Sequence, residues 1–204
     1  MGGSTDPGRR AAAIGFRESE TEMKEGEMPL YPTMKIVLAC LAGAALLTGT
    51  APAGASAQSD LNKLRARNHA FHNIADAEQA GFSVLADNKG LTCIDMPGMG
   101  GMGVHWVKSK RVGDPTEHLT KPEAFVYEPL ADGTLKLAAV EYVVLKADWD
   151  ATHSAPPKLF GHTFNKNKAP NRFGLPAFYS LHVWAWKHNP AGTFAPWNPD
   201  VHCP

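Results

Sequence analysis

The sequence predicts an α+β fold in residues 58–204: a curved, mostly antiparallel sheet or partial barrel of four to five strands, with an N-terminal helix packed on it. Two observations carry this prediction. Residues 60–80 have helical periodicity, with apolar side chains near one face. Residues 123–129 and 134–146 both read as strands, and the turn signal Ala131-Asp132-Gly133 between them predicts a hairpin.

The first 57 residues predict processing sequence. Met34-Lys35 opens a basic segment, an apolar run follows, and Ala55-Ser56-Ala57 is a small-residue cleavage site, so residues 34–57 predict a secretory signal peptide. Residues 1–33 are polar and aperiodic, which indicates a mis-assigned start upstream of Met34 or a disordered extension. A lipoprotein signal at Cys40 is the alternative, but the apolar run before it is short. We therefore expect one globular domain, 58–204, that is periplasmic or secreted.

The charge balance of the chain indicates which classes of partner to expect, and its cysteine content indicates a disulfide. The chain has 20 Lys and Arg against 20 Asp and Glu, so no nucleic-acid partner is implied, and no membrane partner after signal cleavage. Cys93 and Cys203 remain in the exported chain, and an even number of exported cysteines predicts one disulfide between them. Their use as metal thiolates is the weaker alternative, because exported thiols tend to oxidise.

The remaining elements follow in chain order. The helix is expected to begin at Asp60 and to end at Gly81. Residues 83–101 are loop-like. The predicted strands outside the hairpin are, in chain order, 102–108, 158–164 and 177–187.

Glu141 is the residue that points to function. In strict alternation it falls on the more apolar face of 134–146, where burying an ionised carboxylate costs several kcal/mol unless it is paired. His105 and His182 lie within two other predicted strands. Two imidazoles and a carboxylate inside a β structure suit Zn, Fe, Mn or Cu, and three protein ligands leave a coordination position open.

The metal interpretation extends beyond these three residues. His72 on the helix is a candidate fourth ligand. An open position would permit metal-assisted hydrolysis or oxygen chemistry, with Asp76 or His162 as the base. The competing interpretation is a structural hydrogen-bonded network that joins Glu141 to His105 or to Arg172.

Two other functions fit the same sequence. Met96, Met99 and Met102 precede His105 at three-residue spacing, and thioethers with an imidazole suit Cu(I) in a periplasmic copper-handling protein. A pocket walled by the aromatic residues around His182 would instead make the protein a non-catalytic module for a small-molecule ligand, with the buried Glu and His orienting that ligand.

Several phrases together resemble a set of exported bacterial single-domain proteins of uncharacterised function. The likeness covers nearly all of residues 58–204 and rests on Phe71-His72, Ala80-Gly81-Phe82, Gly101-Met102-Gly103-Val104-His105-Trp106, Val140-Glu141-Tyr142, Leu181-His182-Val183-Trp184, and Asn189-Pro190 through Trp197-Asn198-Pro199 to Cys203. The resemblance implies a signal peptide and one small domain. It implies no activity, substrate or catalytic residue.

Overall fold

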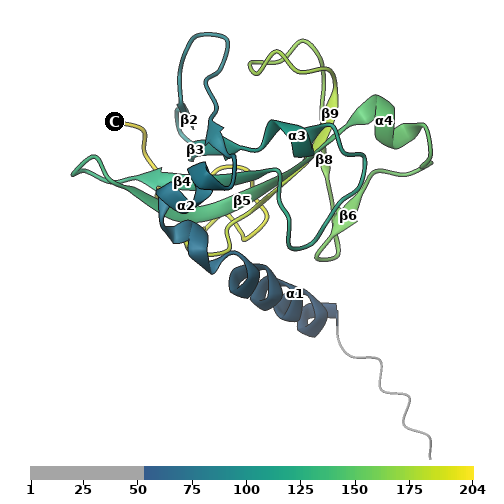
Figure 1. Ribbon diagram of the computed structural model, residues 1–204, viewed down its shortest axis with the longest axis horizontal. Helices are drawn as coiled ribbons and strands as arrows, with labels where there is room; N and C mark the ends of the chain where they lie inside the picture. The colour runs from purple at the N-terminus through teal and green to yellow at the C-terminus, as the bar shows by residue number, and fades with distance from the viewer. Residues whose placement is uncertain (1–52) are drawn as a thin grey trace, which may run out of the picture. The chain divides into compact units, whose positions relative to one another are not determined.

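The computed structural model of the protein describes residues 53–204. The predicted extension 1–33 and residues 34–52 of the predicted signal peptide lie outside the described residues. Among residues 53–204, no helix is long and apolar enough to cross a bilayer. The described chain has an N-terminal helical segment followed by a mostly antiparallel sheet, so the α+β prediction is confirmed (Figure 1).

The helical segment differs from the single helix predicted over 60–80. It consists of α1 (Ala53–Arg67), the 3-10 helix η1 (His69–His72) and α2 (Ile74–Gln79). The break occurs at Asn68, whose buried side-chain amide donates to the carbonyls of Leu64 (2.8 Å) and Thr120 (3.2 Å). An asparagine that bonds to nearby backbone carbonyls competes with helix continuation. Asn73 then caps α2 by accepting a hydrogen bond from the backbone N–H of Ala75.

Within residues 53–204, the main sheet has seven strands, all paired antiparallel, rather than the four to five expected. The order is β1-β3-β4-β5-β9-β8, with β2 beside β1 along the same edge of β3, and the sheet does not close into a barrel. Its strands are β1 (Ser83–Val84), β2 (Cys93–Met96), β3 (Gly100–Val107), β4 (Ala124–Pro129), β5 (Leu135–Leu145), β8 (Asn165–Asn167) and β9 (Phe178–Val183).

The additional elements are short. Two short helices, α3 (Ser109–Val112) and α4 (Lys146–Asp150), follow β3 and β5. The predicted strand 158–164 is instead a small hairpin of β6 (Lys158–Leu159) and β7 (His162–Thr163), which turns at Phe160 and Gly161, both with positive φ. The segment 83–101, predicted to be a loop, contains β1 and β2.

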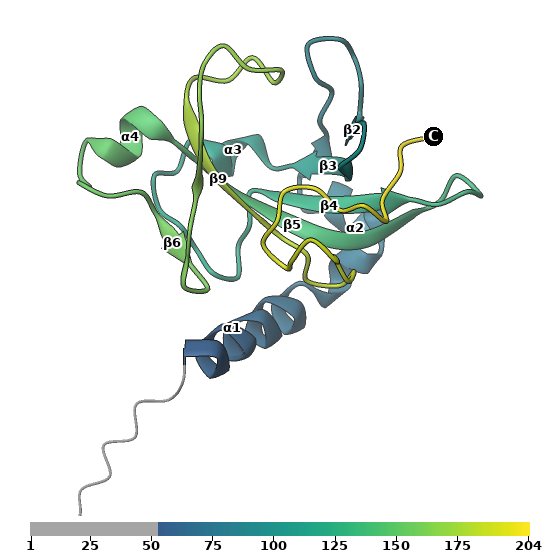
Figure 2. The same ribbon diagram turned by 180° about the vertical axis from the view of Figure 1, so that it is seen from behind.

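The two faces of the sheet have different partners. The helical segment covers one face, as the opposite views in Figures 1 and 2 show. The side chains directed to that face include the row Trp106, Phe125, Val140 and Val183 and belong to the main core. The opposite face carries His105, Glu141 and His182 and is bordered by loops and the short helix α3. We call it the loop face.

A β-bulge in β5 interrupts the side-chain alternation that the sequence predicts along 134–146. Val126 pairs with Ala139 and Tyr127 with Leu137, so Ala138 is the extra residue. The carbonyl of Ala138 accepts hydrogen bonds from the backbone N–H groups of Trp186 (3.0 Å) and Lys187 (3.1 Å). Because a bulge reverses the side-chain parity, Leu137 packs in the core under the helices, while Ala139 and Glu141 stay on the loop face.

The disulfide predicted between Cys93 and Cys203 is confirmed: the two sulfur atoms lie at bonding distance, 2.08 Å. It joins β2 to the end of the C-terminal segment that follows β9. The tail therefore returns to the β2–β3 edge of the sheet, and its residues Pro196 and Trp197 line a cavity on the loop face.

Candidate metal centre

His105, Glu141 and His182 come from three strands, and the sheet register brings them together. Glu141 on β5 lies directly opposite His182 on β9. His105 on β3 is separated from Glu141 by strand β4 and lies two pairing rows away, which is the next row on the same face. The β4 residue in the row of Glu141 is Ala124, whose methyl group leaves room for two long side chains to meet above it.

The three side chains form a compact group. Nε2 of His105 lies 2.9 Å from Oε2 of Glu141. The rings of His105 and His182 are 5.9 Å apart between centroids and lie edge to face. One ligand atom from each of the three residues lies within 4.8 Å of the others. Metal–ligand bonds of about 2.1 Å bring two ligands of one ion to within about 4.2 Å, so binding would need only a small contraction of the group.

Burying these imidazole rings costs free energy unless their ring nitrogens have a hydrogen-bond or metal partner. His105 and His182 are 2 % and 1 % exposed. Three of their four ring nitrogens have no hydrogen-bond partner among the described residues, and the fourth, Nε2 of His105, has only the carboxylate of Glu141 at 2.9 Å. A buried polar atom left unsatisfied costs about 1–3 kcal/mol. Such orphaned nitrogens are expected where a ligand absent from the protein chain completes the site.

The electrostatics favour the ligand forms of these residues. Burial lowers the pKa of His182 to about 3, against a smaller opposing effect of Glu141, so the imidazole is neutral at physiological pH. Burial alone would raise the pKa of Glu141, but His105, His182 and the Ser180 hydroxyl together lower it below its ordinary value. A neutral imidazole and an ionised carboxylate are the states that bind metals.

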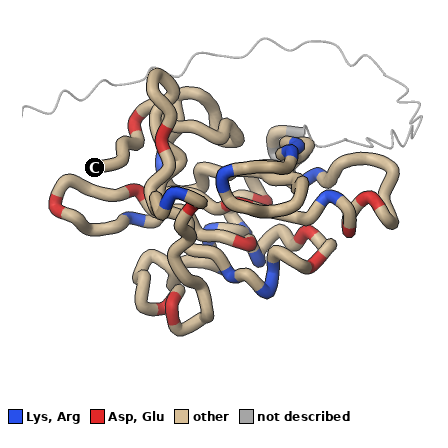
Figure 3. Tube along the Cα trace, turned by 90° about the horizontal axis from the view of Figure 1, so that it is seen from above, with Lys and Arg blue, Asp and Glu red and all other residues tan. Residues whose placement is uncertain are grey.

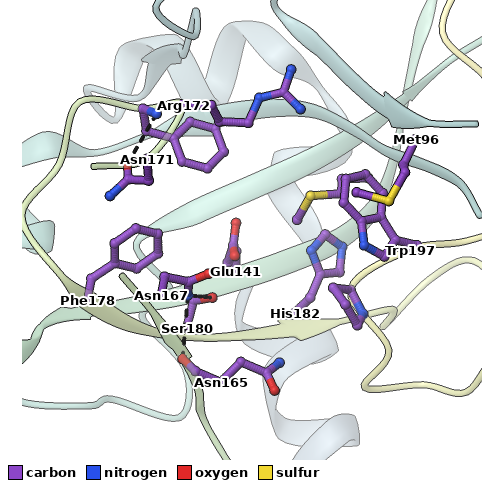
Figure 4. Close-up of a pocket in the computed structure, with 13 residues that line it drawn as sticks. Met96, Glu141, Asn165, Asn167, Asn171, Arg172, Phe178, Ser180, His182 and Trp197 are labelled. Atoms are coloured by element: carbon purple, nitrogen blue, oxygen red, sulfur yellow. Dashed lines mark hydrogen bonds between the residues drawn. The ribbon is translucent and has the colours of Figure 1, made fainter. Parts of the chain in front are cut away.

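A short polar chain supports Glu141 from β8 and β9. The side-chain amide of Asn167 donates to the hydroxyl of Ser180 at 3.0 Å, and Ser180 in turn stabilises the ionised Glu141. Figure 4 shows Glu141 and His182 rising from neighbouring strands into a cavity, with Phe178 on one side and Met96 and Trp197 on the other. Outer contacts of this kind hold a ligating carboxylate in position.

Two cavities adjoin Glu141. The first, about 420 Å³, contains His182, Ser180 and three asparagines, and we call it the amide cavity. The second, about 350 Å³, contains His105 and mostly aliphatic side chains, and we call it the apolar cavity. Glu141, Phe173 and Phe178 line both. The carboxylate is thus accessible from two sides.

The structure places the other sequence-predicted residues elsewhere. His72 is exposed on η1, where it contacts His69 and Trp186, and it is not part of the group. Asp76, on α2, lines neither cavity. His162 is exposed on β7 and stacks on Phe194 at 3.8 Å. Neither Asp76 nor His162 is placed to act as the expected base.

Arg172 does not pair with Glu141. Its guanidinium instead donates from Nε (3.1 Å) and Nη2 (2.8 Å) to Oδ2 of Asp87. This ion pair ties the loop after β1 to the loop before β9, and the backbone N–H of Asn88 adds a bond to the carbonyl of Arg172. Of the network proposed as the alternative to a metal, only the contact with His105 is present.

The methionines divide into two groups. Met96 and Met102 line the amide cavity together with His182, whereas Met99 lines neither cavity and is 47 % exposed. The equal sequence spacing of the three methionines therefore does not place their side chains in one cavity. The glycines between them have a structural role, because the tail packs directly on the backbone of Gly100 and Gly101.

Sequence reasoning missed several residues of the site. Asn167 and the cavity walls at Phe173 and Leu175 lie in 165–176, a polar segment without a periodic pattern. Outside the site, sequence reasoning also missed a buried acid: Glu123 is 2 % exposed and lines neither cavity, and its Oε2 accepts a hydrogen bond from the backbone N–H of Val143 at 2.9 Å. Its position at the start of a strand rich in apolar residues was the available signal.

Neither acidic nor basic side chains predominate on one side of the described chain. Acidic and basic residues are both spread over the described residues, and neither kind gathers on one side (Figure 3). The electrostatic character of the site therefore comes from Glu141 and its immediate neighbours rather than from a wide field.

Comparison of the chain with protein-family models, with curated proteins and with solved structures finds no match. The function of the site is accordingly argued from its own geometry, and the resemblance to exported bacterial proteins stays a proposal.

Proposed function

We propose that the protein binds one transition-metal ion through His105, Glu141 and His182. A single observation carries the proposal: two buried imidazoles, whose only close polar contact among the described residues is that of His105 with Glu141, converge on this carboxylate between two cavities. A cation at their common point would satisfy all three groups at once. Two nitrogens and one oxygen suit Zn, Fe, Mn or Cu.

A metal accounts for the site better than a hydrogen-bonded network does. In a network, each buried ring would have both nitrogens occupied by carbonyls, carboxylates or water. Here the close contact with Glu141 involves only Nε2 of His105, and His182 makes no hydrogen bond to the described chain. The low pKa of His182 also leaves a lone pair free for coordination at neutral pH.

Three protein ligands leave at least one position of a four-coordinate ion for water or substrate. The two cavities beside Glu141 give such a molecule access. Metal-assisted hydrolysis or oxygen chemistry would fit this arrangement. The disulfide and the signal-like N-terminal sequence support a periplasmic or secreted protein, where the metal would be acquired.

The test is elemental analysis by mass spectrometry on the full chain, produced without a histidine tag in a host that exports it. We expect one ion per chain in the wild type. Glu141→Gln, which is nearly isosteric, should lower the metal affinity by about 100-fold or more and leave the fold intact. His162→Ala, in an exposed ring outside the group, is the matched control. Equal metal content in wild type and Glu141→Gln would refute the proposal.

A second candidate is Cu(I) handling, favoured by the two thioethers in the cavity that holds His182. The paired substitutions Met96→Leu and Met102→Leu should then abolish Cu(I) binding. Met99→Leu provides the control, because that side chain lies outside the cavity. Retention of Cu(I) by the paired variant would exclude this function.

A third candidate is ligand binding without any metal. Phe173, Phe178 and Trp197 line the amide cavity, as expected for an aromatic pocket. Trp184 packs beside His182 with ring centroids 4.7 Å apart, whereas Trp186 contacts His72 instead. This function predicts ligand affinity that is insensitive to chelators, whereas the metal proposal predicts its loss.

A further inference from the structure

We propose that the apolar cavity receives the hydrocarbon part of a small amphipathic ligand, whose oxygen-bearing head group lies at Glu141 and its metal ion. This inference rests on the proposed function and names the class of ligand for the same site. The two cavities then contact different parts of one ligand, since the apolar cavity selects the ligand body and the amide cavity surrounds the head group.

The residues that line the apolar cavity are those expected of a site for an apolar ligand part. Its polar side chains are confined to His105, Glu141 and Ser109. Most of the remaining wall is aliphatic and comes from several separate segments: Leu85, Val107, Val112, Val143, Leu145 and Leu175. An apolar enclosure with a few polar groups is the usual composition of a small-molecule site.

The walls are not filled by the protein itself. Leu85, Val107 and Leu175 are only half-buried although they surround one space. That space measures about 350 Å³, near the lower end of ligand pockets at about 300–1,000 Å³. The size fits a short hydrocarbon body rather than a long-chain lipid.

The position of Glu141 defines the orientation of the ligand. Glu141 lines both cavities, as do Phe173 and Phe178, whose rings meet edge to face at 6.5 Å. On the far side of this boundary lie Asn165, whose side-chain amide can donate and accept hydrogen bonds, and Asn167, whose side-chain oxygen can accept them. A ligand with its apolar part beside His105 would therefore present its head group to the carboxylate, the metal and the amides.

The wall around the apolar cavity is held in place before any ligand binds. The Asp87–Arg172 ion pair and the bonds of Asn171 to the backbone of Phe173 and Leu175 hold the loop that carries Phe173 and Leu175. Such preorganisation reduces the ordering cost that binding would otherwise incur.

The experiment is calorimetric titration of the metal-loaded full chain with straight-chain carboxylates from acetate to octanoate. Each added methylene should raise the affinity by about fourfold until the cavity is full. Leu175→Gln makes one wall polar and should reduce the affinity gained per added methylene, and elemental analysis of the same sample measures its metal content. Leu130→Gln, on an exposed turn, is the matched control.

A second titration separates failure of this inference from failure of the metal proposal. Straight-chain alkylamines are titrated into chelator-treated protein, where the ammonium group can pair with ionised Glu141. Chain-length dependence that is reduced in Leu175→Gln supports the assignment of the apolar cavity even if no metal binds. Affinity that is independent of chain length in both series overturns the inference, whatever the elemental analysis shows.

Discussion

Gly101 and Asn198 form an isolated antiparallel bridge between β3 and the C-terminal tail, with N–O distances of 3.1 and 3.0 Å in the two directions. The bridge brings two backbones into contact next to the disulfide. A Cβ atom on the neighbouring Gly100 would lie only 2.0 Å from the carbonyl oxygen of Asn198, and Gly100 has φ +86°. Glycine is therefore required at this position by both space and backbone conformation.

Gly100→Ala should lower the free energy of unfolding by about 3 kcal/mol, because it adds a backbone clash to the strain of a left-handed residue. Gly98→Ala is the matched control: Gly98 has φ +81° but nothing within 4 Å of the added Cβ. That variant should lose only about 1 kcal/mol. Urea denaturation measures both, and equal losses would contradict the close approach of the tail.

Removal of the disulfide should be costly because of the length of chain it closes. Cys93 and Cys203 are separated by 110 positions, and in the chain-entropy model a loop of this size contributes about 4.8 kcal/mol. The double substitution Cys93→Ser with Cys203→Ser should therefore lower the urea midpoint markedly. Reduction of the wild type should give the same midpoint, and a reduced wild type as stable as the oxidised one would contradict the prediction.

The sequence predicted those parts of the fold that depend on local pattern. The hairpin of β4 and β5 was found from its alternation and its Asp-Gly turn, and the disulfide from cysteine parity. The bulge at Ala138 was not predictable in this way, because its carbonyl is satisfied by Trp186 and Lys187, which are distant in sequence. The short strands β1 and β2 likewise form only through pairing with β3.

In the candidate site, too, only the features that depend on local sequence pattern were predictable. Strict alternation put Glu141 on the more apolar face of 134–146, but the bulge before it moves Leu137 to the core face, so Glu141 lies on the less apolar face of β5. The register then brings His182 opposite Glu141. His72 was expected beside them from helical periodicity, but the break at Asn68 ends that periodicity. The cavities depend on the loop that contains Leu85 and on β8 with the loop that follows it, whose packing no local pattern encodes.

His72→Ala tests this difference between sequence and structure. His72 is exposed and contacts Trp186 rather than Glu141, so the variant should keep the metal content of the wild type. His182→Ala should lose it, because that imidazole is one of three ligands. Elemental analysis of the two variants side by side gives the answer. Metal loss in His72→Ala at an unchanged thermal midpoint would mean that η1 supplies a fourth ligand.

Glu123 gives the stability of the protein a dependence on pH. Burial raises the pKa of its carboxyl from 4.5 to about 7, although the Val143 N–H and the charge of Arg111 oppose the shift. Between these two pH values the native state keeps a proton that the unfolded state has released. This contribution to stability is therefore fully present below pH 4.5 and is lost as the pH rises towards about 7.

Glu123→Gln should remove this dependence, because its amide stays neutral and its oxygen can still accept the Val143 N–H. The stability of the variant relative to wild type should rise by about 3 kcal/mol between pH 4.5 and pH 7.5. His182, with its pKa lowered to about 3, changes stability in the opposite direction below its ordinary value of 6.5. That contribution is common to both proteins and cancels in the difference.

Urea denaturation across this range measures the difference between Glu123→Gln and wild type, with Glu78→Gln, at an exposed position of α2, as the control. A difference that does not change with pH would show that Glu123 is ionised in the native protein throughout.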